Sequence, residues 1–186
     1  MSIELINQIS KEVISSFTNL TTIGVKKEFT FEIDCETLED YNYDDIRKSE
    51  KFKPIFDILE NITGPVLYWF EVISDTKSDV IYQSLISYKT SGGSKATPAL
   101  KSKPNTNSKI LYVGKVRGSF WGRLITHLGF LKVNGTQGLQ LFYWTKGLNL
   151  KLKLHLIEFN NDMADFIPIL EFGFAKKFEP LFGKHN

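Results

Sequence analysis

Apolar residues recur along this chain with two spacings, one helical and one typical of strands. Residues 3–17 place apolar side chains three to four positions apart, which predicts an amphipathic helix. Alternating or β-branched and aromatic runs bounded by turn residues predict strands instead, and they occupy residues 27–34, 66–73, 109–115 and 149–157. In the last of these runs the leucines occupy every second position, so we expect one buried face.

Helical spacing returns in three further regions. Residues 43–60 predict a helix that Pro54 interrupts, residues 120–128 a helix capped by Ser119 and ended by Gly129, and residues 137–147 another. A final helix is expected at residues 164–178, with Pro168 in its first turn or kinking it.

Residues 79–88 are apolar, β-branched and aromatic, and they predict a second strand or a continuation of the strand at 66–73. After residue 60 the expected order is therefore strand, strand, helix, helix, strand, helix. This order predicts an α+β fold, a small central antiparallel or mixed sheet flanked by helices, with an N-terminal α/β extension.

Two parts are expected along the chain. Residues 1–60 form an acidic N-terminal extension of helix, strand and helix, and residues 61–186 form the main domain. The main domain contains a loop at about residues 89–108 that is rich in Ser, Gly, Pro and Lys and carries only positive charges.

Composition supports a folded protein with a real core, since 42% of the 186 residues are hydrophobic and 13% are aromatic. No apolar run has the length needed to cross a bilayer, and the N-terminus lacks the layout of a signal peptide. We therefore expect a cytoplasmic protein without a membrane partner. The single cysteine, Cys35, excludes an internal disulfide and a cysteine-based zinc site.

Charge is strongly segregated although the net charge is only +2. Residues 1–79 carry a net −8, residues 80–157 carry +12 with no acidic residue, and residues 158–186 carry −2. A basic middle of this size would attract a polyanion such as nucleic acid. Internal pairing with the acidic N-terminal part is the alternative explanation.

Chemically useful side chains gather in residues 110–127. Tyr112 ends a strand just before Gly114, and the next helix carries Arg123 and His127 four residues apart on one side. Arginine suits a phosphate because its planar fork makes bidentate contacts, and histidine can move a proton near neutral pH. Tyr68, on the preceding strand, would face the same site if the two strands pair antiparallel.

A carboxylate for a metal ion comes from the last helix, where Glu171 lies at the edge of an apolar stripe. One carboxylate is enough to recruit Mg²⁺ when a substrate phosphate and waters fill the other positions. A solvated helix glutamate is the ordinary alternative.

With these residues in place, the chain resembles the GIY-YIG nuclease superfamily over residues 64–183. The first motif would be Gly64-Pro-Val-Leu-Tyr68 and the second Tyr112-Val-Gly114, followed by Arg123 and His127 and then Glu171. The resemblance departs from the family in the spacing of the first motif, for which Tyr82 is a rival tyrosine. Family members often carry an asparagine after the terminal proline, and Asn186 is the nearest here.

This resemblance implies an endonuclease that hydrolyses DNA phosphodiesters with Mg²⁺ or Mn²⁺. Tyr68, Tyr112, Arg123, His127 and Glu171 would be catalytic, Glu171 as the metal ligand. Arg123 would neutralise charge on the phosphorus, and one of the two tyrosines would position or deprotonate the attacking water. The expected DNA-binding cations are Lys95, Lys101, Lys103, Lys109, Lys115 and Arg117.

An alternative from another class is a catalytically inactive nucleic-acid-binding module of the same fold, which would bind DNA in a salt-sensitive way without cleaving it. The acidic residues 1–60 are unsuited to reading DNA. They could brace the core, form a homodimer interface or bind a protein partner.

Overall fold

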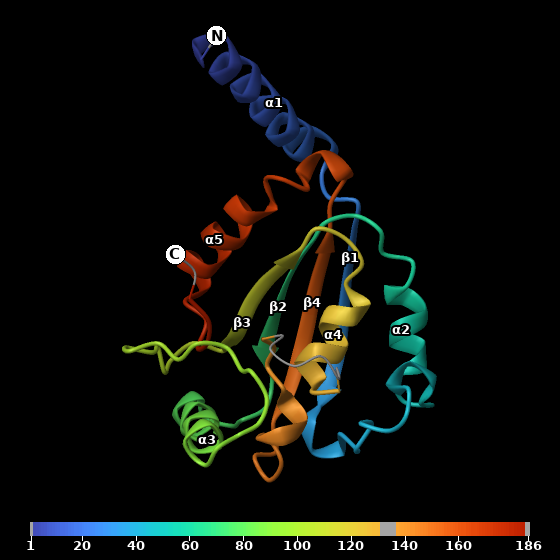
Figure 1. The fold of residues 1–186 in the computed structure, drawn as a ribbon, viewed down its shortest axis with the longest axis vertical. Helices are drawn as coiled ribbons and strands as arrows, with labels where there is room; N and C mark the ends of the chain where they lie inside the picture. The colour runs from blue at the N-terminus through green and yellow to red at the C-terminus, as the bar shows by residue number, and fades with distance from the viewer. Residues whose placement is uncertain (1, 131–136, 185–186) are drawn as a thin grey trace.

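A computed structural model describes residues 2–130 and 137–184, and its centre is a four-stranded antiparallel sheet. The strand order is β1-β4-β2-β3 (Figure 1). The strands are β1 (Lys27–Asp34), β2 (Val66–Val72), β3 (Ile110–Val116) and β4 (Lys151–Glu158). The expected α+β fold, a small antiparallel sheet flanked by helices, is confirmed.

Five α-helices surround this sheet in the described residues (Figure 1). They are α1 (Ser2–Ile23), α2 (Lys53–Leu59), α3 (Ser78–Thr90), α4 (Trp121–Leu128) and α5 (Ile167–Phe178). Pro54 and Pro168 lie in the first turns of α2 and α5, where a missing N–H leaves no hydrogen bond unmade. Because Pro54 begins α2, the segment before it forms only a short 3₁₀ turn, Ile46–Lys48, in place of the single interrupted helix expected at 43–60.

Both faces of the sheet are covered, which explains why β2 is apolar at nearly every position. Tyr68 and Phe70 point into a core shared with α4, whereas Leu67 and Trp69 pack on the opposite face with α5. The expected leucine face of β4 is confirmed, because Leu152, Leu154 and Leu156 are buried. The sheet is therefore the middle layer of a three-layer arrangement.

The N-terminal segment contributes to this sheet through β1, which pairs with β4 along its whole length. Helix α1 extends away from the sheet (Figure 1), and only its C-terminal half approaches the body. Several large aliphatic side chains of α1 are exposed, namely Ile3, Leu5, Ile6, Ile9, Ile14 and Ile23. A dimer or protein partner through residues 1–60 stays a prediction.

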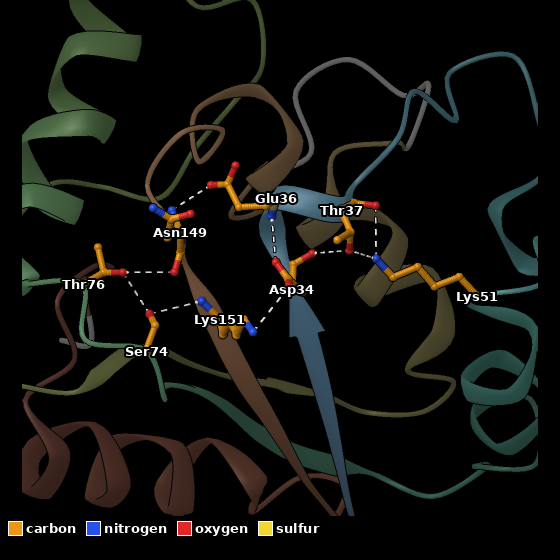
Figure 2. A network of polar contacts seen from close by, with 8 residues as sticks. All are labelled: Asp34, Glu36, Thr37, Lys51, Ser74, Thr76, Asn149 and Lys151. Atoms are coloured by element: carbon orange, nitrogen blue, oxygen red, sulfur yellow. Dashed lines mark hydrogen bonds and ion pairs between the residues drawn. The ribbon is translucent and has the colours of Figure 1, made fainter.

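Polar contacts tie three strands together at one end of the sheet (Figure 2). Glu36, just after β1, accepts hydrogen bonds from the backbone N–H groups of Gly147 (3.0 Å) and Asn149 (2.8 Å) before β4. The hydroxyl of Ser74, after β2, accepts a hydrogen bond from the Lys151 N–H (3.2 Å). These contacts hold the loop ends of β1, β2 and β4 in register.

The expected strand at residues 79–88 is wrong, because these residues belong to helix α3. Ile81 and Leu85 are completely buried. They are four residues apart, which is the spacing of one helix face and not the alternation of a strand. Both edges of β2 are already occupied, by β4 and β3, so the sheet offers no place for another strand beside it.

The expected helix at residues 137–147 is also wrong, since only a 3₁₀ turn forms there, Leu141–Tyr143. The backbone N–H groups before this turn bond to distant partners, Gly138 to the Ala96 carbonyl and Leu139 to the His127 side chain. Gln140 then adopts a left-handed conformation with φ of 56°. A left-handed residue interrupts a right-handed helix, and the bonds of Gly138 and Leu139 hold the backbone before it in place, so no helix forms here.

Helix α4 begins and ends close to the expected positions. Ser119 is not its cap, because Phe120 occupies the N-cap position and no side chain caps the helix. Gly129 ends the helix with φ of 116°, which confirms the expected glycine terminus. No helix among the described residues is both long and apolar enough to cross a membrane.

Candidate functional site

The two tyrosines of the expected site are brought together by antiparallel pairing of β2 with β3. Tyr68 lies opposite Gly114, and its ring centroid is 6.2 Å from that of Tyr112. A Cβ atom at Gly114 would come within 2.4 Å of the Tyr68 hydroxyl oxygen, so only glycine leaves room for the phenol. This contact explains why a glycine follows two residues after Tyr112.

Helix α4 lies over this face of the sheet (Figure 1). Its Arg123 side chain reaches both phenols. Arg123 Nε donates a hydrogen bond to the Tyr68 hydroxyl (2.9 Å), and one Nη donates to the Tyr112 hydroxyl (3.4 Å). The other Nη donates to the backbone carbonyl of Gln137 (2.5 Å). All three nitrogens are thus used to fix the guanidinium beside the tyrosines.

His127 lies deeper than the sequence suggests, because its side chain is completely buried. Its Nδ1 accepts the N–H of Leu139 (3.0 Å), so the ring proton must lie on Nε2, which bonds the Tyr68 hydroxyl (2.9 Å). Burial lowers the pKa of His127 well below its ordinary value, and the positive charge of Arg123 lowers this pKa further. His127 is therefore a neutral donor that positions Tyr68, and it does not line the cleft described below.

Tyr68 is equally inaccessible, with no exposed side-chain surface. Its hydroxyl oxygen accepts hydrogen bonds from His127 and Arg123 at once. Burial raises the pKa of Tyr68, and the nearby Tyr112 raises it further while Arg123 opposes the change. A buried phenol with a raised pKa is a poor base, so Tyr68 serves to orient the groups around it.

The opposite face of the sheet supplies the charged pair of the site. Lys115, on β3, lies opposite Leu67 and points toward α5, where its Nζ is 2.5 Å from a carboxylate oxygen of Glu171. Leu170 and Phe174 on the same helix pack against the second core, and this packing fixes the side of α5 that carries Glu171.

These two sets of side chains meet at the outer edge of β3, the last strand of the sheet, in a cleft of about 530 Å³. Its functional lining residues are Tyr112, Lys115, Arg123 and Glu171. The C-terminal segment runs along the same edge, because the N–H groups of Leu181 and Phe182 bond the carbonyls of Ile110 and Leu111. A guanidinium, a phenol, an ammonium and a carboxylate in one cleft could bind a phosphate ester and position a water beside it.

The expected DNA-binding cations are spread over several surfaces. Lys115 lies in the cleft, and Lys101 and Lys103 line a neighbouring groove. Arg117 is exposed and pairs with Asp165 at 3.3 Å.

The remaining two cations lie away from the cleft. Lys95 lies over the Tyr143 ring at 5.5 Å. Lys109 lines a separate hollow that also contains Asp75 and Asp79, so it belongs to a mixed-charge surface.

A metal ion would have few ligands from the chain. Among the described residues there is no group of three or more His, Cys, Asp or Glu side chains that could hold one, and Glu171 is the one carboxylate among the residues lining the cleft. One carboxylate fits Mg²⁺ only together with waters and substrate phosphate oxygens, and Lys115 would have to release it.

Two other candidates have structural explanations. Gly64 begins the motif expected before Tyr68, and it packs against Glu158, whose carboxylate accepts its N–H (2.9 Å). A Cβ at Gly64 would lie 2.4 Å from the Phe159 carbonyl oxygen. Cys35 is buried, and burial raises the pKa of its thiol to about 12, so it is no nucleophile. Asn186 lies outside the described residues.

Three residues of the cleft were missed from the sequence: Gln137, Phe172 and Lys184. Phe172 follows Glu171 directly in the sequence, and this adjacency was the one usable signal. Gln137 and Lys184 reach the cleft through loop and tail geometry that no periodicity reveals.

Comparison with known proteins gives no relative. No protein-family model matches this chain, and no curated protein or solved structure matches it.

Proposed function

We propose that this protein is a divalent-metal-dependent endonuclease of the GIY-YIG type that hydrolyses phosphodiester bonds in DNA. The single observation that carries the proposal is the meeting of Tyr112, Lys115, Arg123 and Glu171 in one cleft at the edge of β3. These residues come from separate segments, and Tyr112, Arg123 and Glu171 are three of the five side chains that the resemblance implies as catalytic.

Arg123 would stabilise the transition state. Tyr68, Tyr112 and the Gln137 carbonyl hold its guanidinium, so its charge is oriented before substrate arrives. A preorganised cation at a phosphorus centre that gains negative charge stabilises the transition state more than the ground state.

Tyr112 would act on the attacking water. Its ring is only partly buried and lines the cleft, whereas Tyr68 is completely covered. Tyr112 therefore has the access to substrate that a positioning group or general base requires. Lys115 lines the same cleft, where its positive charge would bind a substrate phosphate beside Tyr112.

Glu171 would hold the divalent cation, which supplies charge neutralisation at a phosphate oxygen and at the leaving oxygen. The carboxylate now pairs with Lys115. When the substrate phosphate enters, a divalent cation would replace the Lys115 ammonium beside the Glu171 carboxylate. Lys115 would then be free for its role beside Tyr112.

The test is cleavage of plasmid and branched DNA with Mg²⁺ or Mn²⁺. Wild type should cleave, and Glu171→Gln and Arg123→Ala should lose at least about 100-fold in rate, the range found when one transition-state donor is removed. Glu171→Gln should retain DNA binding. Glu32→Gln, an exposed carboxylate of β1 outside the cleft lining, is the control and should cleave normally.

A nucleic-acid-binding module without catalysis is the second candidate. The short contact between Lys115 and Glu171 favours it, because a lysine that keeps the carboxylate would exclude a cation. This candidate predicts salt-sensitive DNA binding with no cleavage under any metal.

A further inference from the structure

A second hollow of about 660 Å³ adjoins the cleft and shares three lining residues with it: Phe172, Gly183 and Lys184. Its chemically distinctive lining residues are Lys101, Lys103, Phe172, Lys176 and Lys184, and we call it the lysine groove. Because the two hollows share a wall, a chain that leaves the cleft can continue directly into the groove.

The groove is positive throughout. Four of its lining residues are lysines, and none of the described residues that line it is acidic. Within the described part of the chain, Lys103, Lys176 and Lys184 are exposed and form no ion pair. Unpaired lysines along one groove favour a polyanionic backbone.

An acidic residue marks the far end of the groove. Glu179 lies one turn beyond Lys176 and accepts a hydrogen bond from the Asn105 side chain (2.6 Å). Its negative charge would repel a phosphate there, so the groove favours a short segment of backbone next to the cleft.

Phe172 gives the groove a property that lysines alone lack. Its side chain is 49% exposed, and it shares a face of α5 with Lys176, because residues four apart in a helix lie on one face. The apolar packing of α5 uses other residues, including Leu170 and Phe174. Phe172 is therefore not needed to hold the helix on the sheet.

An exposed aromatic ring in a positive groove is the arrangement by which proteins bind single-stranded nucleic acid, with bases stacked on the ring and phosphates near the cations. Bases inside a duplex already stack on one another, so their faces are covered. Lysines alone would bind duplex DNA equally well. The exposed Phe172 ring is what favours single-stranded over double-stranded DNA.

We propose that the lysine groove holds a single-stranded segment of the substrate DNA next to the scissile phosphate, with an unpaired base stacked on Phe172. This inference rests on the proposed nuclease function of the cleft. The favoured substrate is then a DNA with a single-stranded branch or flap, not a continuous duplex.

Binding without added metal tests the stacking. Fluorescence anisotropy with an oligothymidylate of about 20 nucleotides should show about tenfold weaker binding for Phe172→Ala, the loss typical of one stacked base. A duplex of the same length should bind both proteins alike, and Phe172→Trp should retain wild-type affinity. Ile169→Ala, which removes another exposed apolar side chain of α5, is the control and should change nothing.

Adjacent lysines test the electrostatic part. Lys176 lines the groove and Lys177 does not, although both are exposed and lie side by side on α5. Lys176→Gln should reduce the salt dependence of oligothymidylate binding by roughly 0.7 in log–log slope, and Lys177→Gln should leave it unchanged. Equal effects from the two variants would contradict a defined groove.

Cleavage of flapped against continuous duplex DNA separates this inference from the proposed nuclease. If wild type cleaves and Phe172→Ala keeps the same preference between the two substrates, the groove proposal fails and the nuclease stands. If no DNA is cleaved but oligothymidylate binding still depends on Phe172, the nuclease proposal fails and the groove remains a single-strand site. Oligothymidylate binding that ignores Phe172 overturns the inference.

Discussion

The phenol of Tyr68 lies directly over Gly114 of the neighbouring strand, and no other residue at position 114 would leave room for it. The contact links the packing of the sheet to the geometry of the cleft, because Tyr68 in turn holds Arg123 through a hydrogen bond of 2.9 Å. A side chain introduced at Gly114 should therefore disturb the cleft.

Gly114→Ala should lower the free energy of unfolding by about 1–3 kcal/mol, since the new methyl group overpacks the space beside the Tyr68 ring. Urea unfolding followed by tryptophan fluorescence measures the change. Gly122→Ala is the matched control, because no atom lies within 4 Å of a Cβ there and α4 gains a better helix former. Equal stability of wild type and Gly114→Ala would contradict the close contact.

Removal of one phenol hydroxyl at a time should separate the roles of the two tyrosines. Tyr68→Phe leaves His127 and Arg123 without an acceptor in a buried site and should cost about 1–3 kcal/mol of stability. Tyr112→Phe should change stability less and should reduce the proposed cleavage by about 100-fold or more. Thermal unfolding and initial cleavage rates test this contrast, and a reversed order of the two effects would be contrary evidence.

His127 should make the folded state sensitive to acid. Its pKa is well below the ordinary value in the folded state, mainly because of burial, so below pH of about 6.5 only the unfolded chain takes up this proton. Stability should therefore fall as the pH is lowered, by about 2 kcal/mol between pH 6.5 and pH 5.

The variant His127→Gln should lose this part of the acid dependence. The difference between its free energy of unfolding and that of wild type should therefore shrink as the pH is lowered from 7 to 5. His155→Gln, which keeps His127, should retain the steep acid slope of wild type. Urea titrations at the two pH values provide the comparison. Parallel slopes for wild type and His127→Gln would show that His127 does not cause the dependence.

Glu158 should also make the folded state sensitive to acid, but at a lower pH than His127 does. Burial favours protonation of its carboxyl group, but hydrogen bonds from Lys26, Gly64 and Thr63 outweigh burial, and the pKa lies below its ordinary value. The stabilisation is thus complete at neutral pH and is lost as the pH falls below about 4.5 and through the folded-state pKa.

Glu158→Gln should destabilise the protein by about 2 kcal/mol at pH 7, because a neutral amide oxygen accepts the bonds from Lys26, Thr63 and Gly64 more weakly than a buried carboxylate oxygen does. The difference from wild type should narrow near pH 3.5. Glu32→Gln, an exposed position on β1, should alter stability little at either pH. A stability difference between wild type and Glu158→Gln that stays constant with pH would argue against an ionised Glu158.

The sequence by itself determined the four strands and the main functional side chains of the cleft. The four observed strands follow from alternation and β-branched runs, and Tyr112, Arg123 and Glu171 were selected from residue type and spacing. Such features are local, since a strand pattern or a pair four residues apart on a helix depends only on neighbouring residues.

Tertiary structure alone decided the rest. The segment of α3 has strand-like residues, but the sheet has no free edge beside β2. Gly138 and Leu139 give their N–H groups to distant partners, and Gln140 is left-handed. His127 became a buried positioning group because an aromatic core closed over it. Lys115 meets Glu171 only because β3 is an edge strand that both layers reach, and such long-range pairing is not encoded in any local pattern.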